Sequence, residues 1–101
     1  MPRPQRFPIR TPFRYRESGG AGWRQGMTID ISRTGVLFYA ECELPLRTIL
    51  EMQIGFPREM TGCIPGIVLC CGSIVRAEPA GLHKNRPILA AIISNYRFVH
   101  Q

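Results

Sequence analysis

The sequence predicts an all-β protein of about six strands, a small antiparallel barrel or sandwich formed by one domain over residues 1–101. Three observations favour this class. Short apolar or alternating segments recur along the chain, glycine and proline separate them, and no segment has the periodicity of a long helix. The hydrophobic content of 45% is ordinary for a globular protein, and a chain of this length buries a core without disulfides or metals.

Turn residues divide the chain into short elements. The predicted strands cover residues 11–17, 23–32, 36–40, 48–56, 67–77 and 88–99. The segment 18–22 is a glycine-rich loop, and 33–35 is a tight turn in which Gly35 is expected to take a positive φ. Prolines keep residues 1–12 from forming a helix. We therefore expect a flexible N-terminal arm over 1–12, followed by the strands of the domain over 13–99.

The last two predicted strands are apolar on both faces. Ile67, Leu69 and Val75 alternate with Val68 and Ile74, whereas a half-exposed strand alternates with polar residues. Some other part of the protein is therefore expected to cover the outer face. The candidates are the N-terminal arm and a second copy of the chain, so the pattern leaves a homodimer open.

The segment 27–32 carries a distinctive alternation. In an extended strand, Met27, Ile29 and Ile31 point to one face, which we expect to be the core, and Thr28, Asp30 and Ser32 point to the other. This pattern predicts a carboxylate beside a hydroxyl on the outer surface. Two interpretations fit the residues: a strand and capped turn in which Asp30 pairs with an arginine, or one wall of a ligand site.

The positive charge is concentrated in the first part of the chain. The formal net charge is +6, and residues 1–24 hold six arginines against Glu17 alone. Lys84 is the single lysine. The planar guanidinium group of arginine binds a phosphate or a guanine edge through two hydrogen bonds. The charge therefore predicts either a solvated basic face or an anion-binding arm.

Cysteines and histidines do not form a recognisable catalytic or metal site. The four cysteines are Cys42, Cys63, Cys70 and Cys71, and we expect buried, reduced thiols because no C-x-x-C pair occurs. His83 and His100 lie in unrelated contexts, and Ser32 has no histidine near it in sequence. We expect a non-enzymatic protein without cofactor or metal. The sequence also predicts a cytoplasmic protein with no secretory signal and no membrane span.

Two motifs in the expected order resemble a known family. Arg6-x-x-x-Arg10 precedes Asp30-x-Ser32-x-x-Gly35, and both lie in a strand-rich chain of domain length. The pattern is similar to that of the PilZ domain, the bacterial receptor module for the second messenger cyclic di-GMP. The likeness covers nearly the whole chain, up to a late Gly-Ser-Ile-Val-Arg segment at 72–76. PilZ domains are six-stranded antiparallel β-barrels, which agrees with the strand count above. The resemblance therefore implies a six-stranded antiparallel β-barrel over 13–99, in place of a sandwich.

The resemblance implies a function for each motif residue. Arg6 and Arg10 would close over cyclic di-GMP, Asp30 and Ser32 would recognise a guanine and a phosphate on the outer barrel face, and Gly35 would shape the turn. Arm closure would then signal to an unidentified downstream protein. One alternative is a PilZ-like interaction module with little nucleotide binding. A DNA- or RNA-binding barrel is disfavoured because the basic residues are packed into an arm and lack interleaved aromatic platforms.

Overall fold

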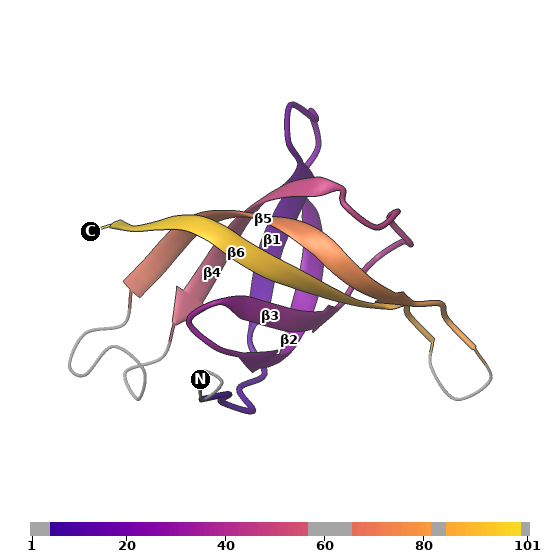
Figure 1. Cartoon of the computed structure of the whole chain (residues 1–101), viewed down its shortest axis with the longest axis horizontal. Helices are drawn as coiled ribbons and strands as arrows, with labels where there is room; N and C mark the ends of the chain where they lie inside the picture. Colours follow the sequence, from indigo (N-terminus) through magenta and orange to yellow (C-terminus); the bar gives the residue numbers. More distant parts are fainter. Residues whose placement is uncertain (1–4, 57–65, 82–84, 100–101) are drawn as a thin grey trace.

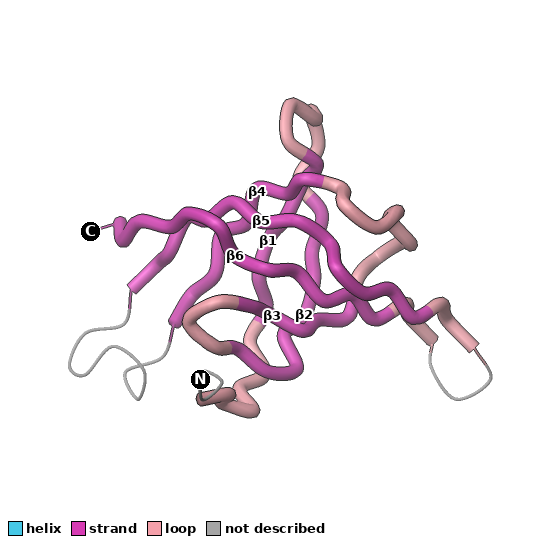
Figure 2. The backbone as a smooth tube through the Cα atoms, viewed as in Figure 1, coloured by secondary structure: helices cyan, strands magenta, loops and turns pink. Residues whose placement is uncertain are grey.

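The computed structural model describes residues 5–56, 66–81 and 85–99. These residues contain strands and loops without a helix (Figures 1 and 2). The strands are β1 (Pro12–Glu17), β2 (Arg24–Ile31), β3 (Gly35–Tyr39), β4 (Ile49–Phe56), β5 (Gly66–Glu78) and β6 (Ile88–Val99). The predicted fold class is confirmed, with every strand end within one residue of its predicted position.

The strands form a closed antiparallel barrel in the order β1-β2-β3-β6-β5-β4. β1 closes the barrel because it pairs with β2 on one edge and with β4 on the other. The chain crosses over after β3, so that β6 lies between β3 and β5. This crossover brings the end of β5 near the turn between β2 and β3, which the sequence separates by about forty residues.

Three aromatic rings form the centre of the core. The rings of Phe13 and Phe38 meet edge to face with centroids 4.8 Å apart, and Tyr15 lies 5.4 Å from Phe38. Tyr15 is fully buried, and its hydroxyl accepts a hydrogen bond of 2.9 Å from the Glu41 amide. Burial raises the pKa of Tyr15, because the phenolate would lose its hydration. The buried Tyr15 hydroxyl therefore has the hydrogen-bond partner that a buried polar group requires.

The predicted alternation of β2 is wrong before Asp30. A β-bulge between Thr28 and Asp30 shifts the register, so that Thr28 points inward with no exposed surface. Ile31 is buried in the core, as expected, whereas Met27 and Ile29 are only half-buried. A bulge inserts one unpaired residue into a strand and reverses the alternation beyond it. Asp30 keeps its predicted outward position for this reason.

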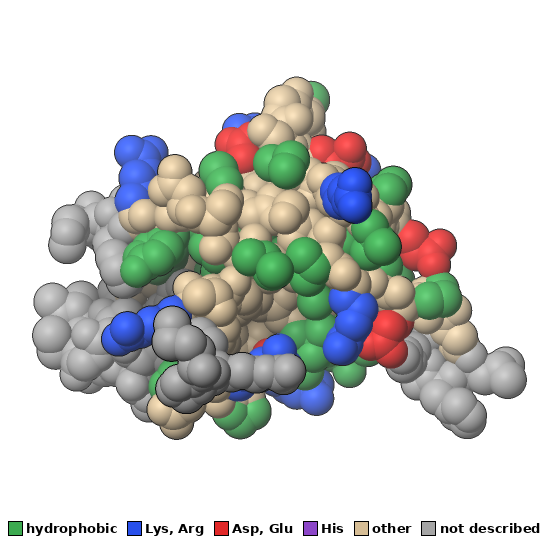
Figure 3. All heavy atoms as spheres, viewed as in Figure 1, with side chains coloured by type: hydrophobic (Ala, Val, Ile, Leu, Met, Phe, Trp, Pro, Cys, Tyr) green, Lys and Arg blue, Asp and Glu red, His purple; other side chains and the backbone are tan. Residues whose placement is uncertain are grey.

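The outer faces of β5 and β6 are apolar, as expected, and they are partly exposed. Val75 is 47% and Ile92 is 50% exposed. Figure 3 shows hydrophobic side chains across the middle of the face over β5 and β6, with arginine side chains around them. The described part of the arm, residues 5–11, lies against β2 and does not cover this face. That a second copy of the chain covers this face stays a prediction.

The described cysteines are free thiols in three different environments. Cys42 is half-buried, Cys70 is buried and Cys71 is exposed. Burial is therefore confirmed for Cys70 and wrong for Cys71, because neighbouring residues of a strand point to opposite faces. Cys63, His83 and His100 lie outside the described residues. Among the residues that the structure describes, no three His, Cys, Asp or Glu side chains are grouped to hold a metal ion. Nor does the described part contain an apolar helix long enough to cross a membrane.

Candidate functional site

The N-terminal arm is joined to the end of β2 by an isolated antiparallel bridge. The Phe7 amide donates to the Ile31 carbonyl oxygen at 2.8 Å, and the Ile31 amide donates back to Phe7 at 3.0 Å. In an antiparallel pair the residue before one partner lies across from the residue after the other. The bridge therefore places Arg6 across from Ser32.

Thr28 fastens the next part of the arm. Its Oγ1 donates to the Ile9 carbonyl oxygen at 2.6 Å and accepts from the Thr11 amide at 2.8 Å. The Thr28 amide also donates to the Thr11 carbonyl oxygen at 3.0 Å. A buried hydroxyl is stable in this position only because these groups satisfy it. The inward turn of Thr28 at the bulge thus holds residues 9–11 against β2.

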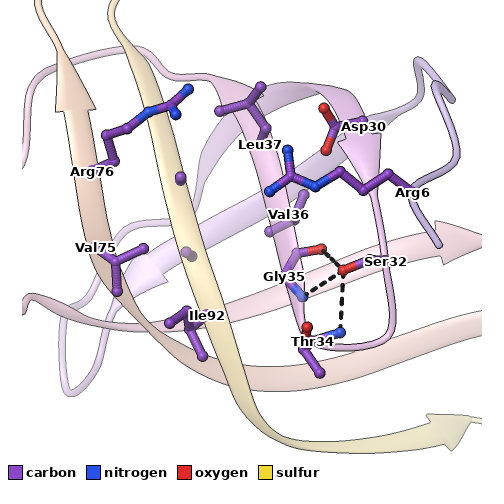
Figure 4. A pocket seen from close by; sticks show the side chains of 12 residues that line it. Arg6, Asp30, Ser32, Thr34, Gly35, Val36, Leu37, Val75, Arg76 and Ile92 are labelled. Atoms are coloured by element: carbon purple, nitrogen blue, oxygen red, sulfur yellow. Dashed lines mark hydrogen bonds between the residues drawn. The ribbon is translucent and has the colours of Figure 1, made fainter. Parts of the chain in front are cut away.

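A shallow pocket of about 230 Å³ lies between the arm, the β2–β3 turn and the crossing strands β5 and β6. Figure 4 shows the side chains of Arg6 and Asp30 on the same side of this pocket, with Arg76 facing them from β5. The residues that line it are Arg6, Asp30, Ser32, Thr34, Gly35, Val36, Leu37, Val75, Arg76, Ala90, Ala91 and Ile92. The pocket therefore combines two guanidinium groups, one carboxylate and an apolar wall.

Ser32 closes the β2–β3 turn. Its side-chain oxygen accepts hydrogen bonds from the amides of Gly35 at 3.1 Å and Thr34 at 3.3 Å (Figure 4). The Ser32 amide donates to the Gly35 carbonyl oxygen at 2.9 Å. These bonds make Ser32 the cap of the turn, and it is 92% buried there, with 8% of its surface exposed. The predicted surface position of the Ser32 hydroxyl is therefore wrong, because the turn amides bind it, although the residue still lines the pocket.

Gly35 does not take the positive φ that we expected. Among the described glycines a positive φ occurs at Gly19. At Gly35 the constraint is space, because a Cβ atom would lie 3.2 Å from the Ala91 carbonyl oxygen. Such a contact is tighter than ordinary van der Waals packing. Glycine therefore allows β3 and β6 to approach closely at the edge of the pocket.

Asp30 presents a half-buried carboxylate to the pocket. Within the described residues no hydrogen bond or ion pair holds this carboxylate, and Figure 4 shows the Arg6 guanidinium beside it. The alternative in which Asp30 pairs with an arginine within the fold is thus not observed. A carboxylate acceptor and a guanidinium donor face one pocket, and both keep capacity for hydrogen bonds to a ligand.

Arg10 lies outside the pocket. Its guanidinium carbon is 5.9 Å from the centre of the Tyr39 ring, a cation–π contact on β3. The arm is fastened at Ile9 and Thr11, on either side of this residue. The structure therefore brings together four of the five predicted site residues, namely Arg6, Asp30, Ser32 and Gly35, and leaves Arg10 apart.

Sequence reasoning missed Arg76 and the apolar wall formed by Leu37, Val75 and Ile92. Arg76 is exposed and pairs with Glu78 at 3.3 Å on the same strand. Its approach to the β2–β3 turn follows from the strand order, which the sequence pattern does not reveal. The sequence predicts a strand over the Gly-Ser-Ile-Val-Arg segment at 72–76, but it does not reveal which strands lie beside it.

Comparisons of this chain with protein-family models, with curated proteins and with solved structures found no match. The description of the site therefore rests on its geometry. The pocket lies on the outside of a small β-barrel and is lined by two arginines, one carboxylate and apolar side chains. Such a pocket suits a flat ligand that carries both hydrogen-bond donors and negative charge.

Proposed function

We propose that this protein is a non-enzymatic receptor for cyclic di-GMP and that the pocket beside the arm binds the ligand. The proposal extends the resemblance to PilZ domains. The observation that carries it is the bridge between Phe7 and Ile31, which brings the arginine motif to the Asp-x-Ser motif. Sequence spacing alone leaves that juxtaposition open.

The chemistry of the pocket supports a guanine ligand. The Asp30 carboxylate accepts hydrogen bonds from the two N–H groups on the Watson–Crick edge of guanine. Arg6 offers a planar pair of donors that matches a phosphate or the O6 and N7 atoms of the base. Leu37 and Ile92 provide apolar surface for the faces of the base. Cyclic di-GMP presents all of these groups in one molecule.

Arg76 faces Arg6 from β5 (Figure 4) and supplies a further donor for a phosphate of the ligand. The resemblance also assigns a contact to Arg10. For Arg10 to reach the pocket, the segment held by Thr28 has to release Ile9 and the guanidinium has to leave Tyr39. Ligand binding would therefore be coupled to a rearrangement of the arm, which a downstream protein can detect.

Isothermal titration calorimetry with cyclic di-GMP tests the proposal. We expect saturable binding to the wild type and at least tenfold weaker binding to Asp30→Asn, since a charge-assisted hydrogen bond contributes about 1.5–3 kcal/mol. Glu43→Gln is the matched control, because Glu43 is exposed in the loop between β3 and β4 and away from the pocket. An absence of heat at about 100 µM wild-type protein would reject nucleotide binding in the useful range.

The position of Arg10 favours one alternative, a PilZ-like interaction module with little nucleotide binding. In that case the Arg10–Tyr39 contact is a permanent part of the arm and does not open. The same titration separates the two functions. If folded wild-type protein binds no cyclic di-GMP, the result would favour the interaction module.

A further inference from the structure

A second hollow on the outer face of the barrel is a groove of about 340 Å³. Its lining residues come from β1, β4, β5 and β6, which are neighbours in the sheet (Figure 1), and from Trp23 just before β2. None of the described residues lines both this groove and the pocket beside the arm. The groove is therefore a separate candidate site.

The register of the strands determines the order of side chains across the groove. Arg14 on β1 pairs with Gln53 on β4. Gln53 pairs in turn with Leu69 on β5, and Leu69 pairs with Arg97 on β6. Directly paired residues point to the same face of a sheet, and the residues on either side of the first three are buried in the core. The four side chains therefore form one row on the outer face, with an arginine at each end.

Positive charge predominates in the groove. At the β1 end, the guanidinium carbons of Arg14 and Arg16 lie 5.2 and 4.4 Å from the centre of the Trp23 ring. Arg16 pairs with Glu51 at 3.2 Å, but its Nε is buried without an acceptor in the described chain, so it keeps unused donor capacity. Within residues 5–56, 66–81 and 85–99, no ion pair neutralises Arg14 or Arg97. Three arginines and one carboxylate therefore leave the groove positively charged.

The separation of the charged ends determines the spacing of a complementary ligand. Neighbouring strands lie about 4.8 Å apart, so the backbones at Arg14 and Arg97, three strand spacings apart, are separated by about 14 Å along the sheet. An extended peptide advances about 3.3 Å per residue, and alternate side chains point the same way. Two acidic residues four positions apart are therefore about 13 Å apart, and both can face the groove.

The middle of the groove suits an uncharged side chain. Leu69 and Cys71 on β5 provide apolar surface there. Glu51 on β4 also lies between the two ends and would repel a third negative charge. A ligand residue midway between the two acidic residues is therefore expected to be apolar.

The same features disfavour a nucleic acid or a membrane in this groove. A nucleic-acid strand carries a phosphate at every nucleotide and stacks its bases on exposed aromatic rings. Closely spaced phosphates would meet Glu51, and the Trp23 ring already contacts two guanidinium groups. An anionic membrane surface is broad and does not reach the floor of a groove. A narrow chain with separated carboxylates fits the observed charges better.

We propose that this groove binds an extended segment of a partner protein with two acidic residues four positions apart and an apolar residue midway between them. One carboxylate binds Arg97, and the other binds Arg14 and Arg16. The apolar side chain packs against Leu69. The segment lies across the strands, and its binding does not depend on the nucleotide pocket.

Fluorescence anisotropy with labelled nine-residue peptides tests this proposal on the full chain. The test peptide has glutamates four positions apart, valine midway between them, and serine and threonine elsewhere. We expect saturable binding with a Kd below about 1 mM. Lysine in place of both glutamates should weaken binding at least tenfold. Glutamates only two positions apart reach one end of the groove and should bind at least about threefold more weakly.

Charge reversal at one end of the groove supplies a matched pair of variants. Arg97→Glu should weaken binding of the test peptide at least about fivefold. Arg86→Glu makes the same change of charge at an exposed position just before β6, outside the groove, and should leave binding within about twofold. Circular dichroism checks that both variants remain folded.

Cys71 reports whether the peptide occupies the groove, because this thiol is exposed and lines it. A saturating concentration of the test peptide should slow the reaction of Cys71 with iodoacetamide at least about threefold. The lysine peptide should leave the rate unchanged.

Four results would each overturn the proposal. The first is no binding of the test peptide to the wild type at about 1 mM. The second is equal binding of the two glutamate spacings, and the third is binding to Arg97→Glu as tight as to the wild type. The fourth is a Cys71 rate that the bound test peptide does not change. If oligothymidylate or anionic vesicles slow Cys71 instead, the groove binds a nucleic acid or a membrane.

Discussion

The hydroxyl of Thr28 lies 2.6 Å from the carbonyl oxygen of Ile9 and donates a hydrogen bond to it. This bond joins a buried residue of the barrel to the arm that carries both motif arginines. It exists because the bulge after Thr28 turns the side chain inward. The bulge in β2 therefore has two effects. It keeps Asp30 on the outer face, and it turns Thr28 inward, where the Thr28 hydroxyl holds the arm.

We expect Thr28→Val to lower the free energy of unfolding by about 1–3 kcal/mol, because the Thr11 amide and the Ile9 carbonyl each lose a partner in a buried place. Urea unfolding measures the change. Thr34→Val is the control: Thr34 is exposed, and the Ser32 oxygen accepts from its main-chain amide, which the substitution keeps. Equal stability of Thr28→Val and the wild type would show that the bonds between Thr28 and the arm contribute nothing.

Gly35→Ala should destabilise the barrel by about 1–3 kcal/mol, since the new methyl group meets the Ala91 carbonyl oxygen and β3 has to move from β6. Thermal unfolding measures this effect. Gly22→Ala is a suitable comparison, because a Cβ atom there has no neighbour within 4 Å. If Gly35→Ala is as stable as the wild type, close packing between these strands is not the reason for glycine at this position.

The sequence predicted the fold well because its signals are local. Alternation within strands and glycine or proline between them locate six strands, which are compatible with a barrel or a sandwich. The resemblance to PilZ domains favoured the barrel. The motif residues Asp30 and Ser32 were found because their spacing in β2 is also local. Arg76 was missed because its place beside the pocket depends on which strands are neighbours, a property of the whole topology.

The bulge in β2 was missed for a different reason. No glycine or proline marks it, so a regular alternation was the simplest interpretation of residues 27–32. That assumption placed Thr28 on the wrong face. The position of Arg10 could not be deduced either, because it depends on how Thr28 holds the arm and on the ring of Tyr39.

The pair between Arg16 and Glu51 should make stability depend on pH. The hydrogen bond from Arg16 lowers the pKa of Glu51 below its usual value of 4.5. A carboxyl group with a lower pKa in the folded state stabilises the fold above its unfolded-state pKa and loses this effect as the pH falls through the folded-state pKa. The wild type should therefore melt at a higher temperature than Glu51→Gln at about pH 6, and the difference should shrink below about pH 4.

Thermal melts between these pH values test this relation. Glu43→Gln should melt like the wild type throughout, since the exposed Glu43 carboxylate makes no ion pair within the described residues. A difference between the wild type and Glu51→Gln that grows as the pH falls would have the wrong sign for the proposed linkage.

Cys70 and Cys71 should react at very different rates although they are neighbours. Burial raises the pKa of Cys70 to about 12, whereas Cys71 is exposed. Since the thiolate is the reactive form, iodoacetamide at about pH 8 should modify Cys71 first in the folded protein. Peptide mapping by mass spectrometry measures each site, and both residues should react in about 8 M urea. Modification of Cys70 at the same rate as Cys71 under native conditions would contradict the buried position.

The most direct test of the proposed function is a residue-resolved NMR titration with cyclic di-GMP. We predict saturable shifts at the amides of Asp30, Ser32 and Gly35 and at Phe7 in the arm, with Asn95 and Arg97 unaffected. The same titration of Asp30→Asn should require at least tenfold more ligand. Absence of shifts at these amides, or saturable shifts confined to another part of the barrel, would contradict a cyclic di-GMP site in this pocket.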